Sequence, residues 1–150
     1  MIAKLKGKIS FFHGNYVVID VNDVGYKVQV TAHTLGRIAS SSEVELYTHT
    51  YVREDKLSLF GFLELEEFDM FELLISISGI GPKAALGILS IADPKMIRAA
   101  VLSEDPSILT RVSGVGKKIA QRVILELKNK VSDLTANQKE KASADSEALE

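Results

Sequence analysis

Two glycine-containing segments carry the residues with the clearest chemistry. Residues 77–85 read Ile-Ser-Gly-Ile-Gly-Pro-Lys-Ala-Ala, and residues 112–120 read Val-Ser-Gly-Val-Gly-Lys-Lys-Ile-Ala. The second segment repeats the first 35 residues later, so the chain contains an internal repeat. Each copy predicts a tight turn leading into a helix, because glycine accepts positive φ and leaves the backbone open to a ligand.

The chemistry that this pattern favours is phosphate binding. Gly81 and Gly116 follow Gly79 and Gly114 and would open the next helix, whose first N–H groups are free and whose dipole is positive. Basic residues stand directly beside these helix starts: Lys83, Lys117 and Lys118. We expect Ile80 and Val115, between the glycines, to pack back between the two helices of each copy.

Two common glycine-rich motifs do not fit the sequence. A dinucleotide fingerprint needs a third glycine, but Ala84 and Ile119 occupy those places, and it needs a preceding strand. An ATPase phosphate loop needs Gly-x4-Gly-Lys-Ser/Thr, which the sequence lacks. Ordinary helix–helix turns remain the alternative, and the duplication with lysines at matching places argues against them.

The charge is unevenly distributed along the chain. The net charge of the 150 residues is −2, but residues 1–78 carry −4, residues 79–130 carry +5 and residues 131–150 carry −3. The positive charge therefore falls on the segment that holds both glycine repeats, where contact with phosphate would need it.

The first part of the chain, residues 1–63, predicts a small β-barrel. Residues 16–21 and 26–30 alternate apolar and polar around the turn residues 22–25, so they predict a hairpin, and residues 43–47 and 56–59 alternate in the same way. Residues 32–38 suggest a short helix or a loop. Several short strands in about sixty residues favour a closed barrel, OB-like rather than the alternative SH3-like type.

An acidic turn lies between two of these strands. Arg53, Glu54, Asp55 and Lys56 form an all-charged segment, with the carboxylates in the middle. The simplest interpretation is a solvated turn that protects a sheet edge.

The second part, residues 64–131, predicts a compact all-α domain of five helices. In the first helix we expect Leu65, Phe68, Phe71 and Ile75 to form the buried stripe. Asp93-Pro94 and Asp105-Pro106 each pair an N-cap with proline at the first helical position, which predicts short helices over 94–102 and 106–112. The last helix should run to about Lys130. The fold class is thus multi-domain, β then α.

The last segment, residues 132–150, is polar and rich in Ala and Ser, which predicts a flexible linker or tail. The chain has no cysteine, no apolar run of membrane-spanning length and no signal-peptide pattern, so we expect no membrane contact and a cytoplasmic location. Its three histidines have no metal-like spacing, and we expect neither a metal nor a cofactor.

The two repeats resemble the helix-hairpin-helix motif, which holds the DNA backbone without reading bases. Over its whole length the chain resembles the RuvA family, the Holliday-junction recognition subunits of the bacterial branch-migration complex. The resemblance rests on the barrel with Val-Arg-Glu-Asp and Phe-Gly, the tandem Gly-Ile-Gly-Pro-Lys and Gly-Val-Gly-Lys-Lys repeats, and the acidic linker.

The resemblance implies particular roles for residues. The residues that it assigns to DNA phosphates are Gly79, Gly81, Lys83, Gly114, Gly116, Lys117, Lys118 and Arg122, the last with the weakest support. It makes Glu54 and Asp55 an acidic pin at the centre of a fourfold tetramer, or of an octamer on DNA. Such an assembly would hold a four-way junction open and planar during recombination, DNA repair and the SOS response.

The resemblance also implies protein partners, the RuvB motor ATPase and the RuvC resolvase. Family members continue into a third helical domain that contacts RuvB, and this sequence stops where that domain would begin, so we expect a shortened form without that contact. The competing functions are a generic duplex-binding module and an accessory domain of a DNA-repair nuclease or glycosylase. The residues offer no obvious catalytic group, so we expect a non-catalytic subunit.

Overall fold

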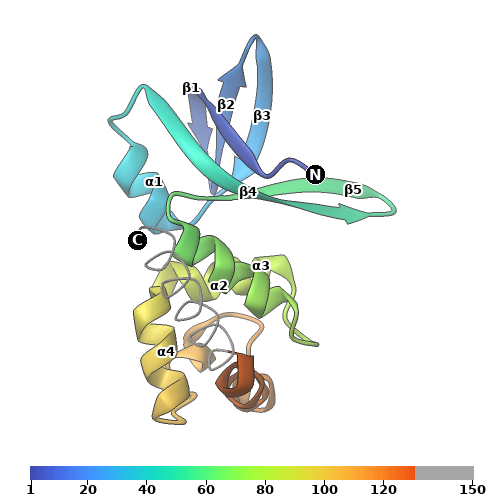
Figure 1. Cartoon of the computed structure of the whole chain (residues 1–150), viewed down its shortest axis with the longest axis vertical. Coiled ribbons are helices and arrows are strands. Elements are labelled where there is room, and N and C mark those ends of the chain that lie inside the picture. The colour runs from blue at the N-terminus through green and yellow to red at the C-terminus, as the bar shows by residue number, and fades with distance from the viewer. Residues whose placement is uncertain (131–150) are drawn as a thin grey trace, which may run out of the picture.

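The computed structural model describes residues 1–130, in which a β-barrel is followed by a cluster of helices (Figure 1). The predicted tail over 132–150 lies outside the described residues. The barrel elements are β1 Lys4–His13, β2 Tyr16–Val21, β3 Val24–Gln29, α1 Ala32–Ile38, β4 Glu43–Arg53 and β5 Lys56–Phe62. The helical elements are α2 Leu65–Ile75, α3 Pro82–Ile91, α4 Pro94–Leu102, the 3₁₀ turn η1 Leu109–Arg111 and a helix over residues 117–130.

The five strands form a closed barrel in the order β1-β2-β3-β5-β4. All neighbouring pairs are antiparallel except β3 and β5, which close the barrel in parallel. Five strands, with a helix between the third and fourth, give the OB-like architecture that the sequence predicted.

The β2–β3 turn is tighter than expected. Asn22 and Asp23 have φ of 51° and 69°, and Val21 pairs directly with Val24. Asn and Asp tolerate this left-handed conformation, so the hairpin needs only two turn residues and β3 begins at Val24, before the predicted Tyr26.

The barrel is filled by its own inward-facing residues. Val17, Ile19 and Val28 are fully buried, as strand alternation predicts. Gly61 lies where β5 crosses this interior, and a Cβ there would stand 2.5 Å from Val28 Cγ1 and 3.0 Å from Leu46 Cδ1. The strand can approach its neighbours this closely because Gly61 has no side chain.

The fourth predicted helix, over 106–112, was wrong, because only one 3₁₀ turn forms there. The Asp105 carboxylate accepts the Ser107 N–H (3.0 Å), two residues on, and makes a local turn in place of a helix cap. Val112 is already extended, with ψ of 130°, so too few residues remain to form a stable α-helix. Asp93, in contrast, caps α4 as predicted by accepting the Met96 N–H.

The buried face of α2 also differs from the prediction. Leu65 is 52% exposed, whereas Met70, Phe71 and Leu74 are almost fully buried. The predicted stripe assumed one packing partner, but α2 has two, the end of the barrel on one side and α3 with α4 on the other. Glu67, which is not part of the predicted stripe, is also buried, with 9% of its surface exposed.

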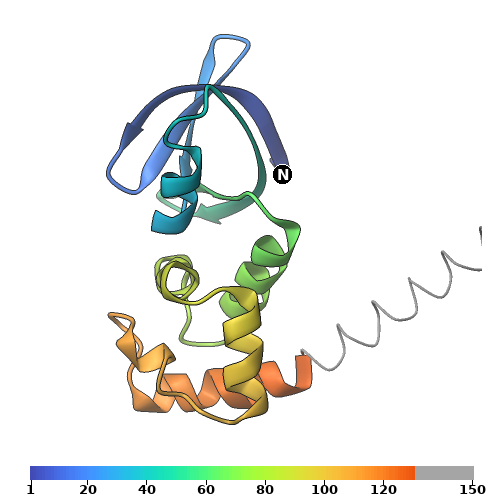
Figure 2. The same cartoon turned by 90° about the vertical axis from the view of Figure 1, so that its left-hand side faces the viewer.

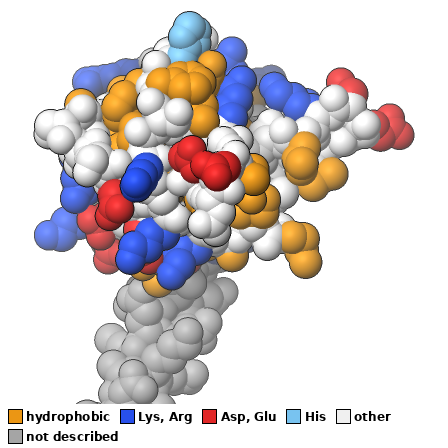
Figure 3. All heavy atoms as spheres, turned by 90° about the horizontal axis from the view of Figure 1, so that it is seen from above, with side chains coloured by type: hydrophobic (Ala, Val, Ile, Leu, Met, Phe, Trp, Pro, Cys, Tyr) orange, Lys and Arg blue, Asp and Glu red, His pale blue; other side chains and the backbone are white. Residues whose placement is uncertain are grey.

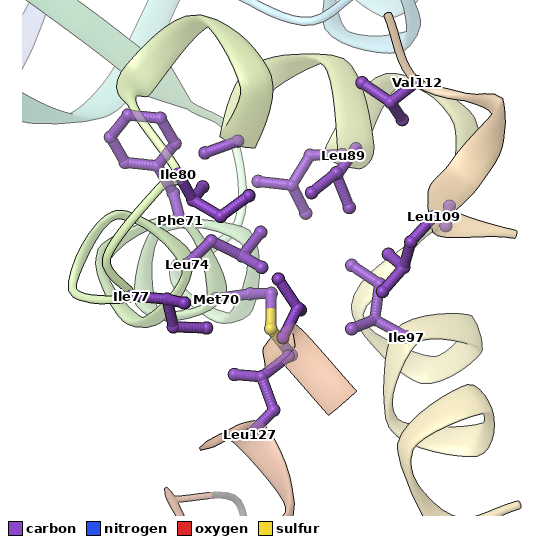
Figure 4. Close-up of a cluster of buried hydrophobic side chains, with 14 of the residues drawn as sticks. Met70, Phe71, Leu74, Ile77, Ile80, Leu89, Ile97, Leu109, Val112 and Leu127 are labelled. Atoms are coloured by element: carbon purple, nitrogen blue, oxygen red, sulfur yellow. The ribbon is translucent and has the colours of Figure 1, made fainter. Parts of the chain in front are cut away.

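The end of β5 belongs to the same hydrophobic core as the helices, whereas the interior of the barrel forms a core of its own. The ring of Phe71 lies 5.3 Å from that of Phe60 and 4.9 Å from that of Phe62, so α2 packs against the end of β5. Figure 4 shows Phe71 beside Ile80, with Met70, Leu74 and Leu127 meeting further into the helical part. This continuous core fixes both glycine repeats relative to the barrel.

Candidate nucleic-acid interface

The first glycine repeat forms the turn between α2 and α3. Gly79 has φ of +95°, and the Ile80 N–H donates to the Ile77 carbonyl (3.0 Å). Ile80 is buried, and it packs back between the helices as expected. Gly81 is the N-cap of α3, and Pro82 takes its first position, where a missing N–H costs nothing.

The second repeat adopts the same local structure. Gly114 has φ of +88°, the Val115 N–H donates to the Val112 carbonyl (3.1 Å), and Val115 is buried. The Ala120 N–H donates to Gly116 (2.9 Å), just as the Ala85 N–H donates to Gly81 (3.0 Å). The repeat seen in the sequence is therefore a repeat of hydrogen bonds and of backbone shape.

The two glycines of each repeat do different things. Positive φ falls only on Gly79 and Gly114, whereas Gly81 has an ordinary extended backbone with φ of −89° and ψ of 176°. A Cβ added at Gly81 or Gly116 would meet nothing within 4 Å. The first glycine makes the turn, and the second leaves the helix start bare and open to solvent.

The basic residues beside the repeats are exposed. Within residues 1–130, no ion-pair or hydrogen-bond partner is found for Lys83, Lys117 or Lys118. Arg122 differs, because its Nε donates to Glu126 Oε1 on the same helix (3.1 Å). The three lysines are thus available to an anion, and Arg122 is already partly neutralised.

Glu54 and Asp55 form the two-residue turn at the end of the long β4–β5 hairpin. Arg53 pairs with Lys56 at the last step of the ladder, and all four residues are exposed. The hairpin extends away from the rest of the barrel (Figure 1), and acidic side chains stand at its outer end, at the right-hand edge of Figure 3.

The structure adds residues that the sequence patterns did not indicate. Asn15 and Gln29 of the barrel line a groove that also contains Lys83 of α3. They belong to a different structural unit and follow no motif, so only the fold could bring them beside the first repeat.

Membrane spans and metal clusters are both absent from residues 1–130. None of the helices in this range has the length and apolar character that a membrane-spanning helix requires. No group of three or more His, Asp or Glu side chains in the same range could hold a metal ion.

Comparisons with known proteins agree with this architecture. The family described as "RuvA N terminal domain" matches residues 1–61, and the one described as "SAM-like Helix-hairpin-helix tandem" matches residues 71–129. A protein named "Holliday junction branch migration complex subunit RuvA" from Alkaliphilus oremlandii is 47% identical over 131 residues, which are 87% of this chain and 68% of that protein. This chain belongs to the RuvA family.

Two more RuvA proteins show the same relation. The one from Acetivibrio thermocellus is 46% identical over 132 residues, which cover 87% of this chain and 65% of that protein. The one from Symbiobacterium thermophilum is 48% identical over 137 residues, which cover 91% and 67%. The chain thus spans about two thirds of the length of these curated relatives. The boundaries proposed at residues 63 and 131 stay predictions.

Proposed function

We propose that this chain binds four-way DNA junctions through their phosphate backbones and acts as a non-catalytic subunit in branch migration. The observation that carries the proposal is the pair of matching turns, each with a bare helix start, with exposed Lys83 beside the first and exposed Lys117 and Lys118 beside the second. Relatives of similar sequence are named as subunits of the Holliday junction branch migration complex. Their names support a four-way junction as the DNA that this chain binds.

The phosphate contacts would come from both turns. Backbone N–H groups at Gly81 and Gly116 suit one phosphate each, because no described residue crowds them and the helix dipole is positive there. Lys83, Lys117 and Lys118 add full charges, and Arg122 adds a weaker one. Contacts of this kind position a duplex without reading its sequence, so we expect little preference among base sequences.

Assembly follows from the same geometry. The two turns of one chain would hold one duplex arm. A junction with four arms would therefore be held by four copies of the chain, related by rotation. In such a tetramer, or in an octamer of two tetramers, Glu54 and Asp55 would face the crossover of an open, planar junction. The family membership supports RuvB as the motor and RuvC as the resolvase that join this complex, and a cytoplasmic location suits these partners.

Competition binding tests the proposal. A labelled four-way junction and a linear duplex of the same arm sequences are titrated with the chain at one fixed salt concentration. The proposal predicts clearly tighter binding of the junction. Equal affinities would favour a generic duplex-binding module, and nicking or base release would favour a repair enzyme.

A further inference from the structure

A groove of about 270 Å³ runs between the barrel and α3. On the helix side it is lined by Lys83, Leu86, Gly87 and Ser90, whose spacing of three, four and seven residues marks one face of α3. On the barrel side its polar lining residues are Asn15 and Gln29. In Figure 2, the blue turn between β1 and β2 stands on the same side of the molecule as α3.

The charge of this groove favours an anion. Among the described residues that line it, Lys83 alone is charged, and the Asn15 and Gln29 amides can donate hydrogen bonds. The Ser90 hydroxyl is already committed, since it donates to the Leu86 carbonyl (2.9 Å). The larger pocket of about 410 Å³ near α1, α2 and α4 differs, because its lining mixes charges: the carboxylates of Glu64, Glu66, Glu67 and Asp93 stand there with His33, Arg37 and Lys95.

The groove continues from the first phosphate site. Lys83 is two residues past Gly81, and from Lys83 to Ser90 the helix rises about 10 Å. Along a DNA strand one phosphate follows another about every 3.4 Å of helix axis. A DNA strand that is held at Gly81 and runs along α3 would therefore have a further phosphate beside this face of the helix.

The barrel side is built firmly enough to position its amides. The Val30 N–H donates to the Asn15 carbonyl (3.1 Å), and Gly14 makes the turn with φ of +60°. Gln29 lies within the sheet, paired with Tyr16 on one side and Phe60 on the other. Binding would therefore require little further ordering of the backbone, so its entropic cost would be small.

We propose that this groove binds a second phosphate of the duplex arm held by the first turn, through Lys83, Asn15 and Gln29. The barrel then takes a direct part in gripping DNA. The inference rests on the proposed function, and it adds to the two turns a contact that ties the arm to the barrel.

The test gives the barrel side of the groove a negative charge. Asn15→Asp with Gln29→Glu keeps the shapes of both side chains and places carboxylates against the phosphate. Asn22→Asp, in the exposed turn between β2 and β3, is the matched control, since aspartate also tolerates its positive φ. Junction affinity is measured by gel shift at one low salt concentration, and thermal unfolding checks each fold.

Each new carboxylate beside the phosphate should weaken binding about fivefold. The pair should cost more than either single change but less than about 25-fold, because both carboxylates act on one phosphate. Asn15→Asp alone, at an exposed residue, should weaken junction binding about fivefold. The control Asn22→Asp should bind like the wild type. Lys83→Gln combined with Gln29→Glu should weaken binding less than the two effects multiplied, because both act on one phosphate.

The outcomes separate the groove from the proposed function. If the wild type binds no junction, the proposed function and this inference both fail. If the wild type binds and the folded Asn15→Asp and paired variants bind equally well, the groove lies off the DNA while the proposed function stands. A cost that multiplies fully with that of Lys83→Gln would also contradict a shared phosphate.

Discussion

Gly81 and Gly116 provide the sharpest residue-level test of backbone contact with phosphate. Neither has positive φ, and an added Cβ meets no atom within 4 Å at either position. We expect Gly81→Val or Gly116→Val to lower junction affinity at least about tenfold by covering the N–H groups, with little change in unfolding free energy. Gel shift and urea unfolding measure the two quantities.

Two more glycines serve as controls for that result. Gly36→Val, at another uncrowded glycine, should leave binding unchanged. Gly79→Ala should destabilise the fold itself, because a φ of +95° strains any side chain. Unchanged junction binding by a folded Gly81→Val protein would remove the bare helix starts from the binding site.

Lys117 and Lys118 test the electrostatic part of binding. If both neutralise phosphates, replacing them by Ala removes counterion release at the second turn. The slope of log affinity against log salt should shrink by about 0.9 for each phosphate that is no longer neutralised, equally for all DNA sequences. The control is Lys4→Ala with Lys6→Ala on β1, where Lys4 pairs with Glu45. A slope that stays the same would place the two lysines away from the DNA.

The sequence could single out these residues because the features that mark them are local. In each copy the first glycine makes the turn and the lysines come a few residues later, so a segment of nine residues contains the whole motif. The sequence did not show that Gly79 has positive φ while Gly81 has an extended backbone, because both residues are glycine. Asn15 and Gln29 were not predictable at all, since only the packing of α3 on the barrel places them beside Lys83.

Helix α2 shows at the element scale why the sequence pattern was incomplete. It packs against both the barrel and α3, so Glu67 becomes buried near α1. Burial raises the pKa of the Glu67 carboxyl above its ordinary value of 4.5, while the positive charges of His33 and Arg37 partly oppose this. Periodicity along one helix cannot reveal a second packing partner.

The raised pKa of Glu67 predicts a pH-dependent stability. The folded protein holds the proton to higher pH than the unfolded chain, so the unfolding free energy should fall as pH rises from 4.5 through the raised pKa. Glu67→Gln cannot ionise, so its stability relative to the wild type should increase across this range and then level off.

Urea unfolding from pH 4.5 to about pH 8 measures that difference in stability. Glu66→Gln, on the exposed side of the same helix, is the matched control for the substitution itself. A difference between Glu67→Gln and the wild type that does not change with pH would show that the Glu67 carboxyl ionises as easily in the folded protein as in the unfolded chain.

The β4–β5 hairpin carries the prediction about discrimination between DNA forms. Carboxylates repel phosphates, and within about 8 Å salt screens little of that repulsion. In the proposed tetramer, a junction would open its arms around Glu54 and Asp55, whereas a continuous duplex crossing the centre would lie against them. Glu54→Gln with Asp55→Asn should therefore raise affinity for linear duplex more than for the junction, and Lys at both positions should narrow the ratio further.

Affinities for both DNA forms at one fixed salt concentration decide this point. Asp23→Asn, in the two-residue turn between β2 and β3, is the control and should leave the ratio as it is. If the ratio also stays constant after the changes at Glu54 and Asp55, the acidic residues serve only as a solvated turn.

At the scale of the whole molecule, the order of a β-barrel and a helical part followed from alternation, turn residues and helix caps. The sequence did not show how the two parts join. Phe60, Phe62 and Phe71 lie in segments with different periodicities, and their contact is a property of the folded chain. That contact places the two glycine turns at a defined position relative to the barrel, which the proposed assembly needs.

The most direct test of the proposed junction binding is the solution mass of the chain, measured alone and with a four-way junction by sedimentation or light scattering. We expect one junction to be bound by four copies of the chain, or by eight, with the same mass for junctions of unrelated sequence. One or two copies per junction, or a chain that stays free when the junction is added, would contradict the proposal.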